Sequence, residues 1–374
     1  MTNITKNIFT DTSKIITESL VQSGADVFIG YPITPANLIY SYSSKRFPIF
    51  LAAPDEITTL QWMSGFSATG KIPVTATSFP GYALMIESIN MAFMMELPMV
   101  IILVQRLGPA TGTATSGAQG DISVINGTLS GGMALPCFSI SNTADCWEIP
   151  SKAVETAVKL RTPVILLTSK EEVMTMTNIN LNEFSELQKV EHPYYTGIKS
   201  YIPYEAGENL VPPFLPLTNN QHQVRMTAST HNKAGIIQNT TEEALENSKR
   251  LYHKMIKNLP DYTFYDLDKQ KNANTLVISY GITSQAAQEA VIKIREQGKR
   301  VSLLVVKTLL PVPNVYFEIA QKYKNIIIAE ENLTGLYSRI LFGANNENLD
   351  IIGINDFGKM ISPDSIIEKV MQYG

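Results

Sequence analysis

The chain has 374 residues, of which 44% are hydrophobic and 17% charged, and its formal net charge is -4. This length exceeds that of one ordinary domain, so we expect two or three domains. The mildly negative charge, without a clustered basic face, argues against nucleic acid as a partner. Two cysteines, Cys137 and Cys146, are too few for a disulfide framework or for the four thiolates that usually hold an iron–sulfur cluster.

No targeting or membrane segment is predicted. The N-terminus lacks a basic region followed by an apolar core, and no apolar run reaches the roughly 18 residues that a membrane span needs. The most apolar stretch, 97–104, has the length of a strand. We therefore expect a cytoplasmic protein without a membrane partner, and the sparse charge fits a chain that hides surface in an assembly.

The first 170 residues alternate short β-rich runs with helical patterns, which is typical of βαβ units on a parallel sheet. Ligands of such sheets gather at the carboxyl ends of the strands. Strands are predicted at 27–29, 49–51, 74–77, 99–104 and 164–167, and helices at 11–22, 36–45, 56–69, 82–95 and 144–161.

After residue 190 the composition changes to Pro, Tyr, Asn, His and Thr, which indicates a connecting segment with one helix near 241–258. The alternation then returns as a smaller α/β domain, with strands at 275–280, 301–306 and 325–329 and helices at 283–297 and 314–323. We therefore predict three parts: a first α/β domain at 1–190, a connecting segment at 191–270 and a second α/β domain at 271–374.

Two loops that follow first-domain strands offer polar groups. In the first, Tyr31–Pro32–Ile33–Thr34–Pro35, a hydroxyl lies between two prolines whose fixed φ angles make a rigid turn. A plain helix start with Thr34 as N-cap explains this pentapeptide equally well. In the second, Asp55 and Glu56 stand at a helix start, where the macrodipole favours negative charge with or without a catalytic role.

Two further loops add a helix start and a long flexible segment. Ser78–Phe79–Pro80–Gly81 could present backbone amides to an anion or a cofactor ring, although it lacks the Gly spacing and Lys of a P-loop. The loop 105–121 is rich in small and hydroxylic residues, which is typical of a binding loop. Arg106 at its start could grip a carboxylate or could form an ion pair with Asp55, Glu56 or Asp121.

Taken in order, these segments resemble the alpha subunits of 2-oxoacid:ferredoxin oxidoreductases, particularly the 2-oxoglutarate branch, over nearly the whole chain. The first-domain matches are 30–35 (GYPITP), 55–57 (DEI), 75–78 (TATS) with 80–81 (PG), and 105–106 (QR) followed by 108–109 (GP) and 111–112 (TG). The second-domain matches are 275–281 (TLVISYG), 301–304 (VSLL) with 308–309 (TL) and Pro311, and 329–332 (AEEN).

The resemblance implies an α/β fold in which a thiamine-diphosphate-binding domain of the pyrimidine type precedes a transketolase C-terminal-like domain. It implies Glu56 as the catalytic carboxylate that bonds the pyrimidine ring, a role that needs a carboxyl out of water. Cofactor-binding positions are then Pro32, Ile33, Glu56, Ser78, Phe79 and Gly81. Substrate-binding positions are Tyr31, Thr34 and Arg106.

The resemblance also implies a partner. A beta subunit would share thiamine diphosphate, hold the diphosphate with Mg²⁺ and carry a [4Fe–4S] cluster, so no metal site is expected on this chain. Gamma and delta subunits are further candidates for the complex. Coenzyme A would be the co-substrate and ferredoxin the electron acceptor of an oxidative decarboxylation that yields an acyl-CoA and CO₂.

This sequence departs from the family pattern beside the expected pocket. Phe79 and Leu107 stand where relatives commonly have glycine, and 114–116 reads Ala-Thr-Ser where the 2-oxoglutarate branch usually has Pro-Thr-Lys. We expect 2-oxoglutarate first, with a branched-chain, aryl or other 2-oxoacid as the alternative. Non-redox decarboxylase or carboligase and non-catalytic scaffold subunits are the competing functions. The loop positions whose role stays open are Leu107, Thr111, Thr113 and Ser116.

Overall fold

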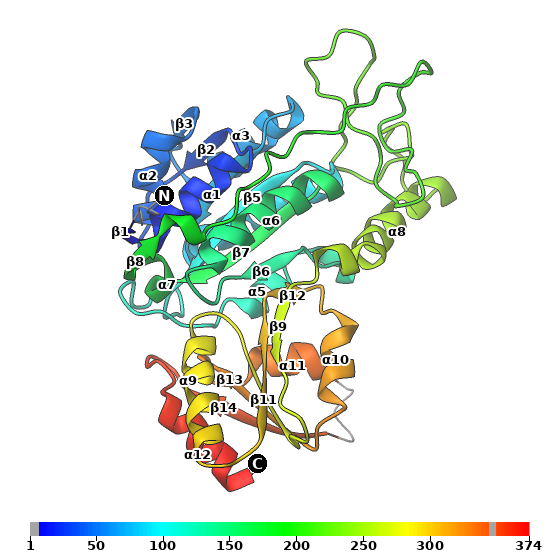
Figure 1. Ribbon diagram of the computed structural model, residues 1–374. Coiled ribbons are helices and arrows are strands. Elements are labelled where there is room, and N and C mark those ends of the chain that lie inside the picture. The colour runs from blue at the N-terminus through cyan, green and yellow to red at the C-terminus, as the bar shows by residue number, and fades with distance from the viewer. Residues whose placement is uncertain (1–6, 344–348, 374) are drawn as a thin grey trace, which may run out of the picture.

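A computed structural model describes residues 7–343 and 349–373. The start of the N-terminal segment, in which no targeting signal is predicted, lies outside these residues. The described chain forms a larger unit around one sheet and a smaller unit around another, joined through a long irregular segment (Figure 1). No helix in the described ranges is long and apolar enough to cross a bilayer.

The larger sheet has seven strands in the order β12-β6-β7-β5-β4-β2-β3. All neighbouring pairs are parallel except β12 with β6. Its central strands are buried on both faces, which explains their continuous runs of apolar residues. The strands are β2 Val27–Gly30, β3 Ile49–Ala52, β4 Pro73–Thr77, β5 Met99–Gln105, β6 Cys137–Ser139, β7 Pro163–Ser169 and β12 Thr308–Leu310.

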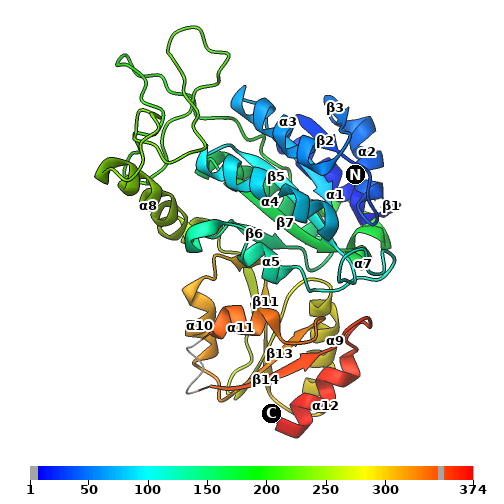
Figure 2. The ribbon, with the colours of Figure 1, turned by 180° about the vertical axis from the view of Figure 1, so that it is seen from behind.

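Helices cover both faces of this sheet. Helices α1 and α6 pack together on the face seen in Figure 1, and α3 and α4 pack together on the face seen in Figure 2. A short antiparallel ladder of β1 and β8 lies beside them. The bounds are α1 Thr12–Gln22, α2 Asn37–Arg46, α3 Glu56–Ala68, α4 Phe79–Met94, α5 Ile122–Asn126, α6 Asp145–Leu160, α7 Lys170–Met174, β1 Asn7–Asp11 and β8 Met176–Asn180.

The smaller sheet has five strands in the order β14-β13-β10-β11-β9, of which only β9 pairs antiparallel. Helices α9 and α12 pack against each other, as do α10 and α11 (Figure 1). The bounds are β9 Tyr265–Asp268, β10 Thr275–Ser279, β11 Val301–Val306, β13 Asn325–Glu330, β14 Asp350–Asn355, α9 Thr283–Glu296, α10 Asn314–Ala320, α11 Leu336–Phe342 and α12 Pro363–Tyr373.

One strand from the second part of the chain belongs to the larger sheet. Strand β12 comes from the range predicted for the second domain, yet it forms the edge of the seven-stranded sheet. Residues 308–310 therefore tie the smaller unit to the larger one through backbone hydrogen bonds.

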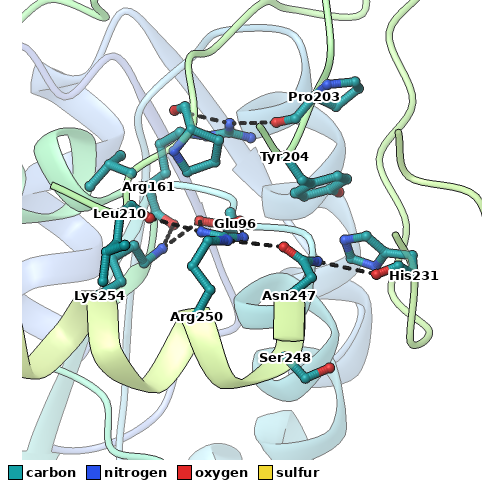
Figure 3. Close-up of polar contacts among 12 residues, drawn as sticks. Glu96, Arg161, Pro203, Tyr204, Leu210, His231, Asn247, Ser248, Arg250 and Lys254 are labelled. Carbon is teal, nitrogen blue, oxygen red and sulfur yellow. Dashed lines mark hydrogen bonds and ion pairs between the residues drawn. The ribbon is translucent and has the colours of Figure 1, made fainter. Parts of the chain in front are cut away.

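The connecting segment is irregular apart from α8 (Glu242–Lys257) and short turns. A buried group of charges fixes it to the larger unit (Figure 3). Glu96, just after α4, pairs with Lys254 and Arg250 of α8, and the Lys254 Nζ to Glu96 Oε2 distance is 2.6 Å. Arg161 donates to the carbonyl oxygen of Pro213 at 2.7 Å. These contacts replace the regular hydrogen bonding that the segment lacks.

The strands and helices predicted in the first 170 residues are present, with two shifts that matter for the site. Helix α4 begins at Phe79 instead of 82, so Ser78 is its N-cap residue and Pro80 lies in its first turn, where proline is tolerated. Helix α2 begins at Asn37 after Ala36, so the alternative of Thr34 as an N-cap is wrong.

Candidate active site

Four loops converge at one edge of the seven-stranded sheet. They follow β2, β3, β4 and β5, which are parallel neighbours. The register places Thr77 beside Leu103, so β4 and β5 end at the same level. Side chains at the carboxyl ends of these strands therefore lie close together, as the sequence predicts.

Glu56 is the first residue of α3, and only 6% of its surface is exposed. The preceding Asp55 is the N-cap, and its Oδ1 accepts from the Thr58 backbone N–H at 2.7 Å. The Glu56 carboxyl accepts no hydrogen bond from any residue that the structure describes. A largely buried carboxyl without a hydrogen-bond partner is uncommon, which makes Glu56 a candidate functional group.

The first turn of α4 lies close to the Glu56 side chain. A Cβ atom placed on Gly81 would lie 2.5 Å from Glu56 Oε1 and would also collide with Thr77 Oγ1. Only glycine leaves the carboxyl where it is. The Ser78 hydroxyl is buried there as well, with no partner in the described chain, and Phe79 is half-buried beside it.

The loop after β2 stands at the surface. Tyr31, Pro32 and Thr34 are exposed and Ile33 is half-buried. The structure brings Thr34 and Arg106 together, because Arg106 Nη1 donates to the Thr34 backbone oxygen at 2.6 Å. The contact uses the peptide oxygen, so the Thr34 hydroxyl remains free for another role.

Arg106 directly follows the buried strand β5, and 6% of its surface is exposed. Within the described ranges it makes no ion pair with Asp55, Glu56 or Asp121, and its Nε has no partner. Burial lowers the pKa of Arg106, while the nearby charge of Asp121 acts in the opposite direction. A buried guanidinium with an unpaired donor is equipped to bind a carboxylate.

A cleft of about 370 Å³ opens between Arg106 and the smaller unit. Its walls are mainly apolar, but two acids line it, Asp121 and Glu331. Glu330 and Glu331 are both buried, and Glu330 accepts from the Tyr337 and Ser338 backbone N–H groups. The lining is Phe79, Arg106, Gly108, Pro109, Ala118, Gly120, Asp121, Glu331, Asn332, Leu333, Thr334, Leu336 and Phe357.

The loop after Arg106 folds back on itself. Leu107 pairs with Thr113 as an antiparallel bridge, and its N–H donates to the Ser116 oxygen at 2.8 Å. Gly112 has φ of 50° and lies against the Leu107 oxygen, which leaves no room for a side chain. Thr111 and Thr113 are exposed at the tip. The binding role of this loop stays a prediction.

Two residues at the end of this loop were not predicted as site residues. Gln119 is buried and bonds the smaller unit, donating to the Tyr280 oxygen at 2.8 Å and accepting from the Glu331 N–H at 2.9 Å. Asp121 lines the cleft with Arg106. The sequence gives no local signal for either, because their surroundings come from the smaller unit and from β5.

A protein-family model that matches more than half of the chain identifies the family. Residues 18–253 match the family described as "Pyruvate flavodoxin/ferredoxin oxidoreductase, thiamine diP-bdg". The chain belongs to the 2-oxoacid:ferredoxin oxidoreductases. It is an alpha subunit of this enzyme class, which oxidises 2-oxoacids with ferredoxin as acceptor. The predictions of an oxidoreductase and of a thiamine-diphosphate-binding fold are therefore confirmed. Residues 273–349 match "Pyruvate:ferredoxin oxidoreductase core domain II".

The names of individual relatives point to two different substrates. The 2-oxoglutarate synthase subunit KorA of Methanothermobacter marburgensis is 28% identical, over 98% of this chain and 99% of its own. The ketoisovalerate oxidoreductase subunit VorB of Methanothermobacter thermautotrophicus is 29% identical, over 78% of this chain and 76% of its own. These names therefore support a 2-oxoacid as substrate. They leave open whether the side chain of that 2-oxoacid is the one of 2-oxoglutarate or the one of ketoisovalerate.

Solved structures share the fold. The 2-oxoglutarate:ferredoxin oxidoreductase from Magnetococcus marinus, with 2-oxoglutarate, coenzyme A and succinyl-CoA bound, superposes with a TM-score of 0.92 at 25% identity. The match covers 98% of this chain but 65% of that one. A split-gene transketolase, at 14% identity and a TM-score of 0.56, shares the fold over 97% of both chains. The prediction of transketolase-like architecture is confirmed.

Proposed function

We propose that this alpha subunit forms, with a beta subunit, an enzyme that converts a 2-oxoacid and coenzyme A to an acyl-CoA and CO₂ and passes two electrons to ferredoxin. The observation that carries the proposal is the Glu56 carboxyl, buried and unpartnered in the described chain, against the bare backbone of Gly81. This is the environment that a carboxyl sharing a proton with a cofactor ring requires.

The residues around Glu56 fit the aminopyrimidine end of thiamine diphosphate. When bound, thiamine diphosphate supplies the carbon nucleophile and the electron sink for loss of CO₂. Glu56 holds a proton in a hydrogen bond with the ring, and Gly81 allows the close approach. The half-buried Phe79, the buried Ser78 and the 32–33 segment of the β2 loop would line this end of the cofactor.

The substrate end is formed by Arg106, Thr34 and Tyr31. Arg106 binds the carboxylate of the 2-oxoacid through a guanidinium that is already held by the Thr34 backbone oxygen. Thr34 and Tyr31 are both exposed on the β2 loop, whose backbone contacts Arg106, and would approach the substrate from this loop. Burial of Arg106 strengthens its attraction for an anion, because water screens the charge less.

The proposal of a beta subunit is supported by apolar side chains exposed around this site. Tyr31, Ile57, Trp62 and Leu84 are each at least 40% exposed on the β2 loop and on α3 and α4. Such a group of aromatic and aliphatic residues is typical of a protein interface. We propose that the beta subunit covers it and brings Mg²⁺, the diphosphate site and the [4Fe–4S] cluster. Gamma or delta subunits would complete the complex.

The substrate expected first is 2-oxoglutarate, which fits the KorA relatives. A 2-oxoacid with a branched or aromatic side chain is the second candidate. It is favoured by the apolar walls of the cleft, where Phe79, Leu336 and Phe357 face a single cation, Arg106. A hydrophobic side chain gains from such walls, whereas a second carboxylate needs a second cation.

The test is an assay of the complex reconstituted with its beta subunit, in which 2-oxoacid-dependent and coenzyme-A-dependent ferredoxin reduction is measured. The panel contains 2-oxoglutarate, pyruvate, 2-oxoisovalerate and phenylpyruvate. We expect turnover of one of the predicted classes and its loss in Arg106→Ala. An assembled, thiamine-loaded complex that turns over none of these acids would overturn the proposal.

A further inference from the structure

Asp121 is the ionisable group of the cleft that the proposed roles leave unused. It precedes α5, 8% of its surface is exposed, and it lines the cleft together with Arg106. Its Oδ2 has no hydrogen-bond partner in the described chain. Its backbone N–H donates to Gln105 Oε1 at 3.3 Å, which links its position to the end of β5.

Arg106 and Asp121 influence each other without forming an ion pair. Burial raises the pKa of Asp121 to about 7, and the charge of Arg106 only partly offsets this effect. Near neutral pH the carboxyl therefore holds a proton for part of the time. Both side chains also keep an unpaired polar atom, Arg106 Nε and Asp121 Oδ2. Two buried, unsatisfied groups on one cleft are complementary to a polar ligand between them.

Few other charged groups face Asp121. Tyr82 of α4 is close, but its hydroxyl is hydrogen-bonded to Thr128 Oγ1 at 2.7 Å. Glu331, which also lines the cleft, accepts from the Thr283 hydroxyl and the Ile361 N–H. Arg339 of α11, which packs against α5, lines a different cavity. Arg106 is therefore the cation whose charge acts on Asp121 in this cleft.

We propose that Asp121 binds the 2-oxoacid as a neutral carboxylic acid, donating a hydrogen bond to the substrate carboxylate that Arg106 holds. The neutral acid and the guanidinium together supply donors to both sides of one carboxylate. Ionised Asp121 is an acceptor only and repels the substrate anion. This role rests on the proposed function, specifically on Arg106 as the carboxylate-binding residue.

The proposal predicts how substrate binding depends on pH. Below about pH 7 Asp121 is neutral and the KM for the 2-oxoacid is low. Above its pKa, kcat/KM falls about tenfold for each further pH unit, because one proton is lost from the free enzyme. In Asp121→Asn the amide still donates but cannot ionise, so this alkaline decline disappears.

The experiment uses the reconstituted complex with Asp121→Asn, Asp121→Ala and, as a control in the short helix that follows Asp121, the exposed Ser123→Ala. From pH 5.5 to 9 we expect kcat/KM of wild type and Ser123→Ala to decline above about pH 7. Asp121→Asn should stay flat in this range. Asp121→Ala should raise KM about tenfold at pH 6 with a smaller change in kcat, since it removes one hydrogen bond to a charged group.

A second readout does not depend on turnover. A raised native pKa means that ionisation of Asp121 opposes folding, so wild-type stability decreases from the unfolded-state pKa near 4 up to about pH 7. Asp121→Asn should therefore raise the melting temperature more at pH 8 than at pH 5. Ser123→Ala should show no such difference.

The results distinguish a failure of this inference from a failure of the proposed function on which it rests. If Arg106→Ala abolishes turnover but Asp121→Asn keeps the wild-type pH profile, the role of Asp121 is wrong and the proposed function stands. If Arg106→Ala keeps full activity, the carboxylate site is elsewhere and both proposals fail. An alkaline limb that vanishes in Asp121→Asn and Asp121→Ala but persists in Ser123→Ala supports the inference.

Discussion

At the scale of single residues, the site depends on the absence of a Cβ atom at Gly81. Any side chain there would meet Glu56 Oε1 and Thr77 Oγ1, and the Glu56 end is the one that can move. Gly81→Ala should therefore displace the carboxyl and lower kcat by about 10²-fold or more, which is the usual contribution of a positioned proton-transfer group.

The control for Gly81→Ala is Gly207→Ala. A Cβ at Gly207 would meet nothing nearer than Asn209 Oδ1 at 3.9 Å, so activity should be unchanged. The thermal melting curve of each variant shows whether the chain stays folded. If Gly81→Ala retains wild-type kcat, the close approach of α4 to Glu56 has no catalytic role.

At the scale of elements, helix α8 is held by the buried charge of Glu96. Burial opposes ionisation of this carboxyl, but the charges of Lys254 and Arg250 outweigh burial and lower its pKa to about 2. Glu96→Gln leaves both cations buried without their counter-ion. We expect a loss of about 3–5 kcal/mol in the free energy of unfolding, measured by urea denaturation.

The pH dependence of that stability has a definite sign. A depressed carboxyl pKa stabilises the native state above the unfolded value near 4.5, and the stabilisation is lost as pH falls toward 2. Glu96→Gln should lack this acid-dependent loss. Glu246→Gln, which breaks an exposed ion pair on the same helix, should leave the melting temperature unchanged. Equal effects of the two substitutions would contradict a structural role for the buried cluster.

The elements that periodicity predicts are those with long apolar patterns. Strand β5 and helix α6 were predicted from such patterns, because burial on one or both faces fixes the residue type. The ladder of β1 and β8 was missed, since its short strands carry polar residues such as Asn7 and Asn180. Pairing partners more than a hundred residues apart leave no local pattern.

For the site, motif order and resemblance indicated Glu56 and Arg106, whereas Asp121 and Gln119 could not be found in this way. Their surroundings are created by tertiary contacts: Gln119 is buried only because β10 and the residues after β13 close on it. The same contacts bury Glu331.

At the scale of the whole molecule, Gln119 joins the two sheets at the edge of the cleft. Its amide bonds the Tyr280 oxygen, the Thr283 hydroxyl and the Glu331 N–H. Gln119→Ala leaves buried backbone groups unpaired, at about 1–3 kcal/mol for each group. We expect faster amide hydrogen exchange in peptides covering 278–285 and 328–334, with exchange in β5 unchanged.

Gln321→Ala is the matched control, since this exposed glutamine at the end of α10 makes no side-chain hydrogen bond in the described structure. It should exchange like wild type. If Gln119→Ala also exchanges like wild type, the two units are held together by other contacts, and the cleft does not depend on this residue.

The central claim is that this chain supplies the catalytic carboxylate of a shared thiamine site, and Glu56→Gln tests it most directly. The measurement is the steady-state rate of 2-oxoacid-dependent and coenzyme-A-dependent ferredoxin reduction by the reconstituted complex. Glu87→Gln, an exposed glutamate of α4, is the matched control. We predict a loss of about 10²–10⁴-fold for Glu56→Gln and none for Glu87→Gln. A Glu56→Gln complex that turns over at the wild-type rate would contradict the account.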